Sequence, residues 1–132
     1  MDKDDFLPIW IKISGWLEIV FGVFMALGMS PMMTTMGIEH VPFWSHMAGI
    51  SLCFMGIILL YSAKDVKQFI IVPIISSLYR FVIVIAEIYC FITFYGTSPV
   101  VANILLVASF YDGGSAAVTL WLLWDLGYLK KD

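Results

Sequence analysis

Four apolar runs, each long enough to cross a bilayer, dominate the sequence and are separated by short polar connections. They cover residues 9–29, 41–63, 69–95 and 99–124. A transmembrane helix needs roughly 20 apolar residues, and lipid contains no water to pair with an open backbone, so only helices or closed barrels cross it. The runs predict an all-α, four-transmembrane-helix bundle with up-down-up-down topology, its helices at about residues 9–29, 43–63, 69–95 and 99–126.

Composition supports an integral membrane protein. Apolar residues make up 61% of the chain and charged residues 13%, whereas soluble domains have roughly 45–50% and 25%. Residues 1–132 are therefore expected to form a single membrane domain with an outer loop at 30–42. With so little hydrophilic sequence, a nucleic-acid-binding role is excluded. Cys53 and Cys90 lie inside apolar runs, where cysteine behaves as a small buried hydrophobe.

The distribution of lysines predicts the orientation in the membrane. The chain begins with the acidic stretch MDKDD and Glu18 interrupts the first run, so we expect this run to be a retained helix rather than a signal peptide. Positively charged connections face the cytoplasm. With up-down-up-down helices, both termini and the second connection are expected on the cytoplasmic side, because all six lysines fall there: Lys3, Lys12, Lys64, Lys67, Lys130 and Lys131.

The pair Asp112-Gly113 lies within the fourth apolar run. In soluble proteins Asp-Gly between apolar segments is a strong signal for a hairpin turn. A turn here would leave pieces of about a dozen residues, too short to span as helices. We therefore predict a continuous helix through Asp112. Small residues at helical spacing predict a close helix contact beside it, in the two lines Ser109-Gly113-Ala117 and Ala108-Asp112-Ala116.

Three of the predicted helices carry a charge at similar depth: Glu18, Arg80 and Asp112. At about 1.5 Å per residue, each lies roughly 13 to 20 Å into its helix, near the bilayer midplane. An isolated charge there costs on the order of 3 kcal/mol, so these side chains are expected to meet in a buried cluster around the planar guanidinium. Glu87 lies two turns beyond Arg80 on the same helix face. With acids outnumbering the base, at least one acid is expected to carry a proton at neutral pH.

Small residues recur every three to four positions on the first two predicted helices. Such seams allow close helix packing in membranes. The first seam contains Glu18, which is therefore expected to face the bundle. The seams consist of Ser14, Glu18, Gly22 and Ala26 on the first helix and of Ser45, Gly49, Cys53 and Gly56 on the second.

The outer loop is rich in methionine and contains two histidines. Thioether and imidazole groups are ligands for Cu(I), whereas methionine also serves as flexible apolar packing in irregular segments. No other cofactor is indicated, and no glycine-rich phosphate loop, Cys-x-x-Cys or His-Glu-x-x-His motif points to enzymatic activity. The copper hypothesis concerns Met32, Met33, Met36, His40 and His46.

The segments GWLEIVFGVFMALGMSP, LLYSAKD and ASFYDGGSAA, with an arginine in the third helix, resemble the small four-helix membrane proteins of the DoxX-like and BphX-like kind. Some proteins of this kind occur with terminal quinol oxidases or aromatic-degradation enzymes. The resemblance implies an intramembrane polar centre at Glu18, Arg80 and Asp112.

Three functions remain open from the sequence. In the first, the polar centre with Glu87 binds a small amphipathic ligand such as a quinone, a sterol-like molecule or a lipid, with possible proton linkage. In the second, the chain is a non-catalytic subunit or an oligomeric component of a larger membrane complex. In the third, it is a small oligomeric channel or proton pathway. A cluster that only locks helix register is the structural alternative to all three.

Overall fold

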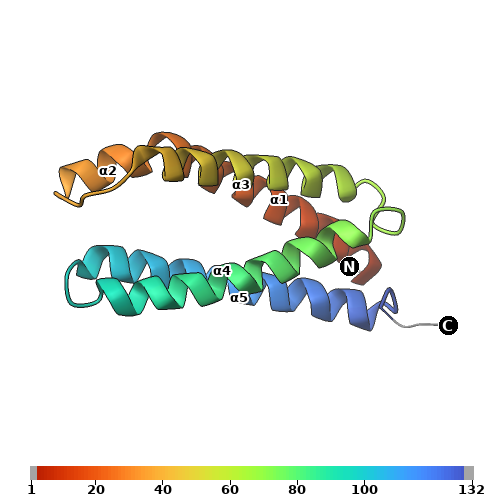
Figure 1. Ribbon diagram of the computed structural model, residues 1–132. Coiled ribbons are helices and arrows are strands. Elements are labelled where there is room, and N and C mark those ends of the chain that lie inside the picture. Colours follow the sequence, from red (N-terminus) through yellow and green to blue (C-terminus); the bar gives the residue numbers. More distant parts are fainter. Residues whose placement is uncertain (1–2, 130–132) are drawn as a thin grey trace. The chain divides into compact units, whose positions relative to one another are not determined.

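The computed structural model describes residues 3–129, which form five helices and no strand (Figure 1). Four of the helices are long and apolar enough to cross a membrane. The all-α class and the four spans predicted from the sequence are thus confirmed, and they support a multi-pass integral membrane protein. Lys130 and Lys131 lie outside the described residues, as does the side chain of Lys3. The helices are α1 (Lys3–Leu27), α2 (Met29–Thr35), α3 (Pro42–Ser62), α4 (Ile71–Phe94) and α5 (Pro99–Asp125).

Two compact units divide the chain. The N-terminal unit, Pro8–Phe69, contains most of α1 together with α2 and α3. The C-terminal unit contains α4 and α5 and includes the start of α1 up to Leu7. Helix α1 begins before the apolar run at residue 9, because acidic residues such as Asp5 are favourable near the positive N-terminal end of a helix.

In the N-terminal unit, α1 and α3 run antiparallel and their backbones touch at glycines. A Cβ atom on Gly56 would lie 2.5 Å from the Gly15 carbonyl oxygen, and one on Gly49 would lie 2.5 Å from the Gly22 carbonyl oxygen. The predicted packing seam of α3 is therefore confirmed at Gly49 and Gly56. On α1 the contact runs through Gly15, Ile19, Gly22 and Ala26.

Sequence spacing placed Glu18 in this seam, but Ile19 occupies the position against Gly56. Adjacent helix positions point about 100° apart, because a helix has 3.6 residues per turn, so Glu18 lies beside the line of closest approach. Its side chain is nevertheless 4% exposed, which agrees with the expectation that it is buried.

Part of the expected outer loop is helical. Helix α2 covers Met29–Thr35 and contacts α3. Gly37 follows two residues after its end, and its φ of 69° allows the Ile38 N–H to bond the Met33 carbonyl at 3.0 Å. This left-handed glycine is a common helix terminator. Helix α2 was not predicted from the sequence because its seven residues are too few for a clear apolar period. Helix α3 then begins with Pro42 in its first turn, where no N–H is needed.

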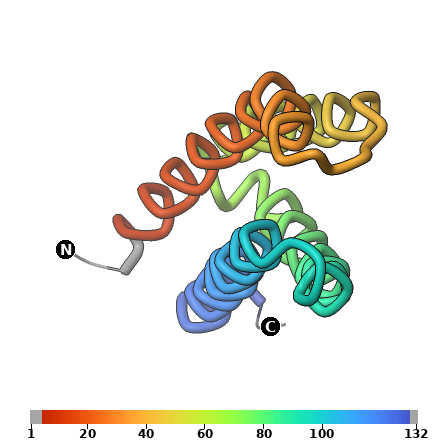
Figure 2. Tube along the Cα trace, turned by 90° about the vertical axis from the view of Figure 1, so that its left-hand side faces the viewer, coloured from red at the N-terminus to blue at the C-terminus, as the bar shows by residue number. Residues whose placement is uncertain are grey.

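The C-terminal unit is a helical hairpin in which α4 and α5 pack against each other (Figures 1 and 2). Helix α5 continues through Asp112 and both glycines that follow, so the prediction of a helix rather than a turn is confirmed. The predicted close contact is absent at Gly113, although Ser109 and Ala116 of the same predicted stripe are buried. A Cβ there would meet Val84 at an ordinary 3.6 Å, and one on Gly114 would meet nothing within 4 Å.

Large apolar side chains cover the outside of the long helices. Examples are Ile85 at 71% exposed and Phe110 at 73% exposed. Aromatic residues lie exposed at helix ends, including Trp44 and Trp124, as expected for the interfaces between lipid and water. An apolar surface of this extent is typical of a protein whose solvent is lipid.

Candidate intramembrane polar site

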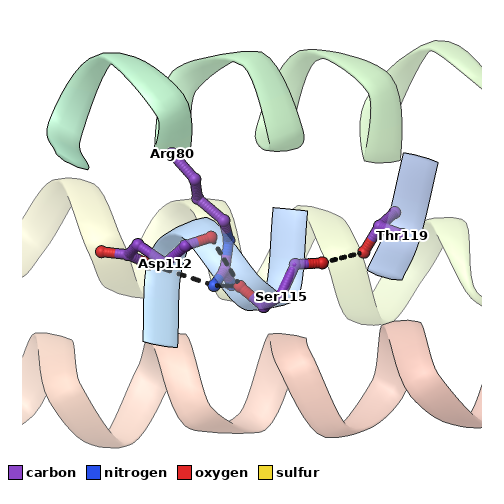
Figure 3. A network of polar contacts seen from close by, with 4 residues as sticks. All are labelled: Arg80, Asp112, Ser115 and Thr119. Carbon is purple, nitrogen blue, oxygen red and sulfur yellow. Dashed lines mark hydrogen bonds and ion pairs between the residues drawn. The ribbon is translucent and has the colours of Figure 1, made fainter. Parts of the chain in front are cut away.

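Arg80 is the centre of a polar network between α4 and α5 (Figure 3). It lies about 13 Å into α4, and Asp112 lies about 20 Å into α5, so both are far from the helix ends. The Arg80 side chain is 4% exposed, and its Nη1 lies 3.1 Å from Asp112 Oδ1. The predicted Arg80–Asp112 pair is therefore present. A charge-assisted bond of this kind removes most of the penalty that either charge would have alone in an apolar environment.

Ser115 is a second hydrogen-bond partner of the guanidinium. Its hydroxyl accepts a hydrogen bond from Arg80 Nη1 and donates to the Asp112 carbonyl at 3.1 Å. One turn further along, the Thr119 hydroxyl donates to the Ser115 carbonyl at 2.8 Å (Figure 3). Hydroxyls that bond to their own helix satisfy their donors without water. Arg80 Nη1 thus has two acceptors, the neutral hydroxyl of Ser115 and the charged carboxylate of Asp112.

An aromatic ring faces the same cation. The Arg80 Cζ atom lies 5.1 Å from the centroid of the Tyr111 ring, within the range of a cation–π interaction. Arg80 therefore contacts a carboxylate, a hydroxyl and a ring, all from α5. These three contacts fix the position of the guanidinium, because hydrogen bonds depend on the direction of its N–H groups and ring stacking depends on the orientation of its plane.

Glu87 lies on the same helix as Arg80 but outside this hydrogen-bonded set. It is half-buried, and its Oε2 atom is shielded and accepts no hydrogen bond from residues 3–129. Asp112 is close enough to exert electrostatic repulsion on it. Glu87 is thus a second acid near the pair, without a base of its own on α4 or α5.

Glu18 belongs to the N-terminal unit and is 4% exposed. Its membership of one cluster with Arg80 and Asp112 stays a prediction. Within the C-terminal unit, the structure brings together Arg80 and Asp112 and places Glu87 in the electrostatic range of Asp112.

Ser115 and Tyr111 were missed by the sequence analysis. Ser115 follows Asp112 by three positions, a spacing that places both on one helix face, so this signal was available. Tyr111 has no comparable signal, because neighbouring helix positions point in different directions and only the position of Arg80 identifies its ring as a partner.

The residues of the copper hypothesis lie on and around α2. The Nε2 atom of His40 is 2.8 Å from the Ser30 hydroxyl, and its Nδ1 atom is 3.0 Å from the Ile38 carbonyl. His46 lies on α3 with its Nδ1 atom bonded to the Pro42 carbonyl. In the described part of the chain, no group of three or more His, Cys, Asp or Glu side chains is placed to hold a metal. Copper binding through Met32, Met33 and Met36 stays a prediction.

No protein-family model, curated protein or solved structure matches the chain. The DoxX-like and BphX-like resemblance therefore stays a prediction, and the chemistry of the site is interpreted from its own contacts.

Proposed function

We propose that this multi-pass membrane protein binds a small amphipathic molecule, such as a quinone, a sterol-like molecule or a lipid, at the Arg80–Asp112 centre. The observation that supports the proposal is the buried guanidinium held by a carboxylate, a hydroxyl and a ring in the interior of an apolar hairpin. Ionisable groups at this depth are rare and usually mark a substrate or ion site, because register alone is obtained with apolar packing.

The chemistry of the centre suits a ligand with one polar end. Lipid-facing side chains surround the hairpin, so an apolar tail has a favourable environment, and Ser115 and Glu87 lie beside the ion pair as hydrogen-bonding groups. Proton linkage belongs to the same proposal, because the acids of α4 and α5 outnumber the single base.

Native mass spectrometry in mild detergent tests the proposal. The expected result is a small molecule retained by the wild-type protein and lost from the double variant Arg80→Leu/Asp112→Leu, which removes both charges together. Glu39→Gln, at an exposed position outside the long helices, is the control and should retain the molecule. Equal retention by the double variant, or an empty wild-type protein with normal stability, contradicts the proposal and favours a structural lock.

A second candidate function, a subunit or oligomeric component, is favoured by the glycine pair on α5. Gly114 is exposed and has open space where a Cβ would lie. A glycine at such a place weakens the helix, which is explained if the backbone of another chain approaches there. The oligomeric channel or proton pathway has less support, since the Ser77 and Thr93 hydroxyls bond to carbonyls of their own helix and Asn103 is exposed.

Both termini are proposed to face the cytoplasm. Because α1 and α3 are antiparallel, Lys12 in the first half of α1 lies toward the same end of that hairpin as Lys64 after α3. The exposed Lys67 follows in the same connection. A concentration of positive charge at one end of a membrane hairpin is typical of the cytoplasmic side.

A further inference from the structure

The interior of the α4–α5 hairpin has an excess of negative charge. Apart from Asp125 at the end of α5, the charged residues of these two helices are Arg80, Glu87 and Asp112. Arg80 and Asp112 neutralise each other at 3.1 Å. Glu87 is therefore left as an acid with no base to balance it on either helix.

The position of Glu87 keeps it close to the pair. It follows Arg80 by two helical turns, roughly 10 Å along α4, on the same face. Asp112 on α5 repels it, and its buried Oε2 accepts no hydrogen bond from the described residues. Arg80 on its own helix and Asp112 on the helix packed against it are the charged groups near Glu87 in this unit. Glu18, in the other unit, is also an acid and adds no positive charge.

An ionised carboxylate without a cation is costly at this depth, so Glu87 requires either a proton or a positively charged group. We propose that Glu87 receives the ammonium group of an amphipathic ligand and carries a proton when the site is empty. The inference rests on the proposed function and narrows it, because among quinones, sterol-like molecules and lipids it selects a lipid-like molecule with a positively charged head.

Binding is then an exchange of one positive charge for another. The neutral Glu87 carboxyl releases its proton to water, and the resulting carboxylate pairs with the ammonium, so the net charge of the hairpin interior stays zero. The Arg80–Asp112 pair is unchanged in this step. It makes the site selective by charge, since an anionic head would add a negative charge beside Asp112 that no base on α4 or α5 balances.

Labelling with dicyclohexylcarbodiimide tests the inference, because this apolar reagent adds to protonated carboxyl groups and the product is located by peptide mass spectrometry. In the purified protein, washed in dodecyl maltoside until native mass spectrometry finds the site empty, Glu87 is expected to be labelled at neutral pH. Dodecyltrimethylammonium should slow labelling of Glu87 about tenfold or more, which corresponds to at least about 1.4 kcal/mol of binding. Dodecanol, which has the same chain but no charge, should have no effect.

Two further comparisons show whether both the alkyl chain and the positive charge of the ligand are required. Tetramethylammonium, which lacks the alkyl chain, should protect Glu87 far less than dodecyltrimethylammonium does. Equal protection by both would overturn the assignment of an amphipathic ligand. Equal slowing by dodecanol and dodecyltrimethylammonium would overturn the assignment of a positively charged head.

The variant Asp112→Asn provides a test in which Glu87 itself is unchanged. Without Asp112, Arg80 becomes the counter-charge of Glu87, so both labelling and protection by dodecyltrimethylammonium should be lost. Asp125→Asn, the same substitution at the exposed end of α5, is the matched control and should behave as wild type. Glu87→Gln should remove the labelled peptide. Circular dichroism and monodispersity confirm that each variant is folded.

The inference fails if Glu87 in Asp112→Asn is labelled as fast as in wild type, or if wild-type Glu87 is not labelled. The proposed function has a separate readout. Suppose that a neutral small molecule is retained in an Arg80-dependent manner, while dodecyltrimethylammonium does not protect Glu87 from labelling. This result would agree with the proposed function and overturn the role given to Glu87.

Discussion

Arg80 on α4 and Asp112 on α5 are 32 residues apart in the sequence, and their side chains meet at 3.1 Å between the two helices. The arginine is the more deeply buried partner, at 4% exposed against 19% for the aspartate. The pair connects the two helices at one register and defines the polar centre.

The first prediction concerns the stability of this pair. Arg80→Leu leaves Asp112 unpaired and should lower the free energy of unfolding by about 3–5 kcal/mol, because an uncompensated buried charge remains. The double variant Arg80→Leu/Asp112→Leu should lose much less, since both charges are gone. Unfolding of both variants in mixed micelles, followed by circular dichroism, checks this. A double variant as unstable as the single one would show that the loss does not come from the unpaired acid.

The second prediction compares the same substitution at two glycines. Gly49→Ala should destabilise the N-terminal unit by about 1–3 kcal/mol, because the new Cβ would lie 2.5 Å from the Gly22 carbonyl oxygen and the helices must separate. Gly114→Ala should stabilise α5 by up to about 1 kcal/mol, because its Cβ enters open space and alanine favours helix. Thermal unfolding of the two variants is expected to shift in opposite directions. Unchanged or raised stability of Gly49→Ala would contradict the packing described for α1 and α3, and a loss in Gly114→Ala would contradict the open space at that glycine.

The third prediction concerns partner helices. If α5 contacts another chain at Gly114, then Gly114→Leu should reduce the oligomer or complex seen by chemical cross-linking in membranes, because the added side chain keeps the backbones apart. Ala48→Leu, at an exposed position of α3, is the matched control and should leave cross-linking unchanged. If both variants cross-link as wild type does, the glycine pair has no role in assembly.

The fourth prediction concerns orientation. In a background with Cys53→Ala and Cys90→Ala, a cysteine introduced as Glu39→Cys should react with an impermeant maleimide added to intact cells. A cysteine introduced as Lys64→Cys should react only after the cells are permeabilised, because the lysine-rich connection is expected to face the cytoplasm. Reaction at position 64 in intact cells would reverse the proposed orientation.

Much of the secondary structure could be predicted because lipid permits so few alternatives. Asp112-Gly113 is a turn signal in water, yet the structure has a helix there, since an interrupted span would expose backbone groups to lipid. The pairing of Arg80 with Asp112 was predicted for a similar reason, because an unpaired charge in the membrane interior is costly. Helix α2 was not anticipated, because its seven residues provide too little periodicity.

Details of side-chain contact were predicted less well. Repeats every four residues identified Gly22 and Gly49 as packing positions, but they placed Glu18 on the seam where Ile19 lies. A difference of one helix position rotates a side chain by about 100°, and sequence spacing does not resolve it. The stacking of Tyr111 on Arg80 depends on how α5 is turned against α4, which no local pattern records.

By itself, the sequence determined that the chain forms four apolar spans with charges in their interiors, because the costs of burying backbone and charge in lipid depend on residue type and run length. The tertiary structure alone decided which polar groups meet. It brought Ser115 and Tyr111 to Arg80, and it left Glu87 outside the ion pair. Contacts of this kind depend on the rotation and register of α4 against α5, which are set by packing along the whole hairpin rather than by any single residue.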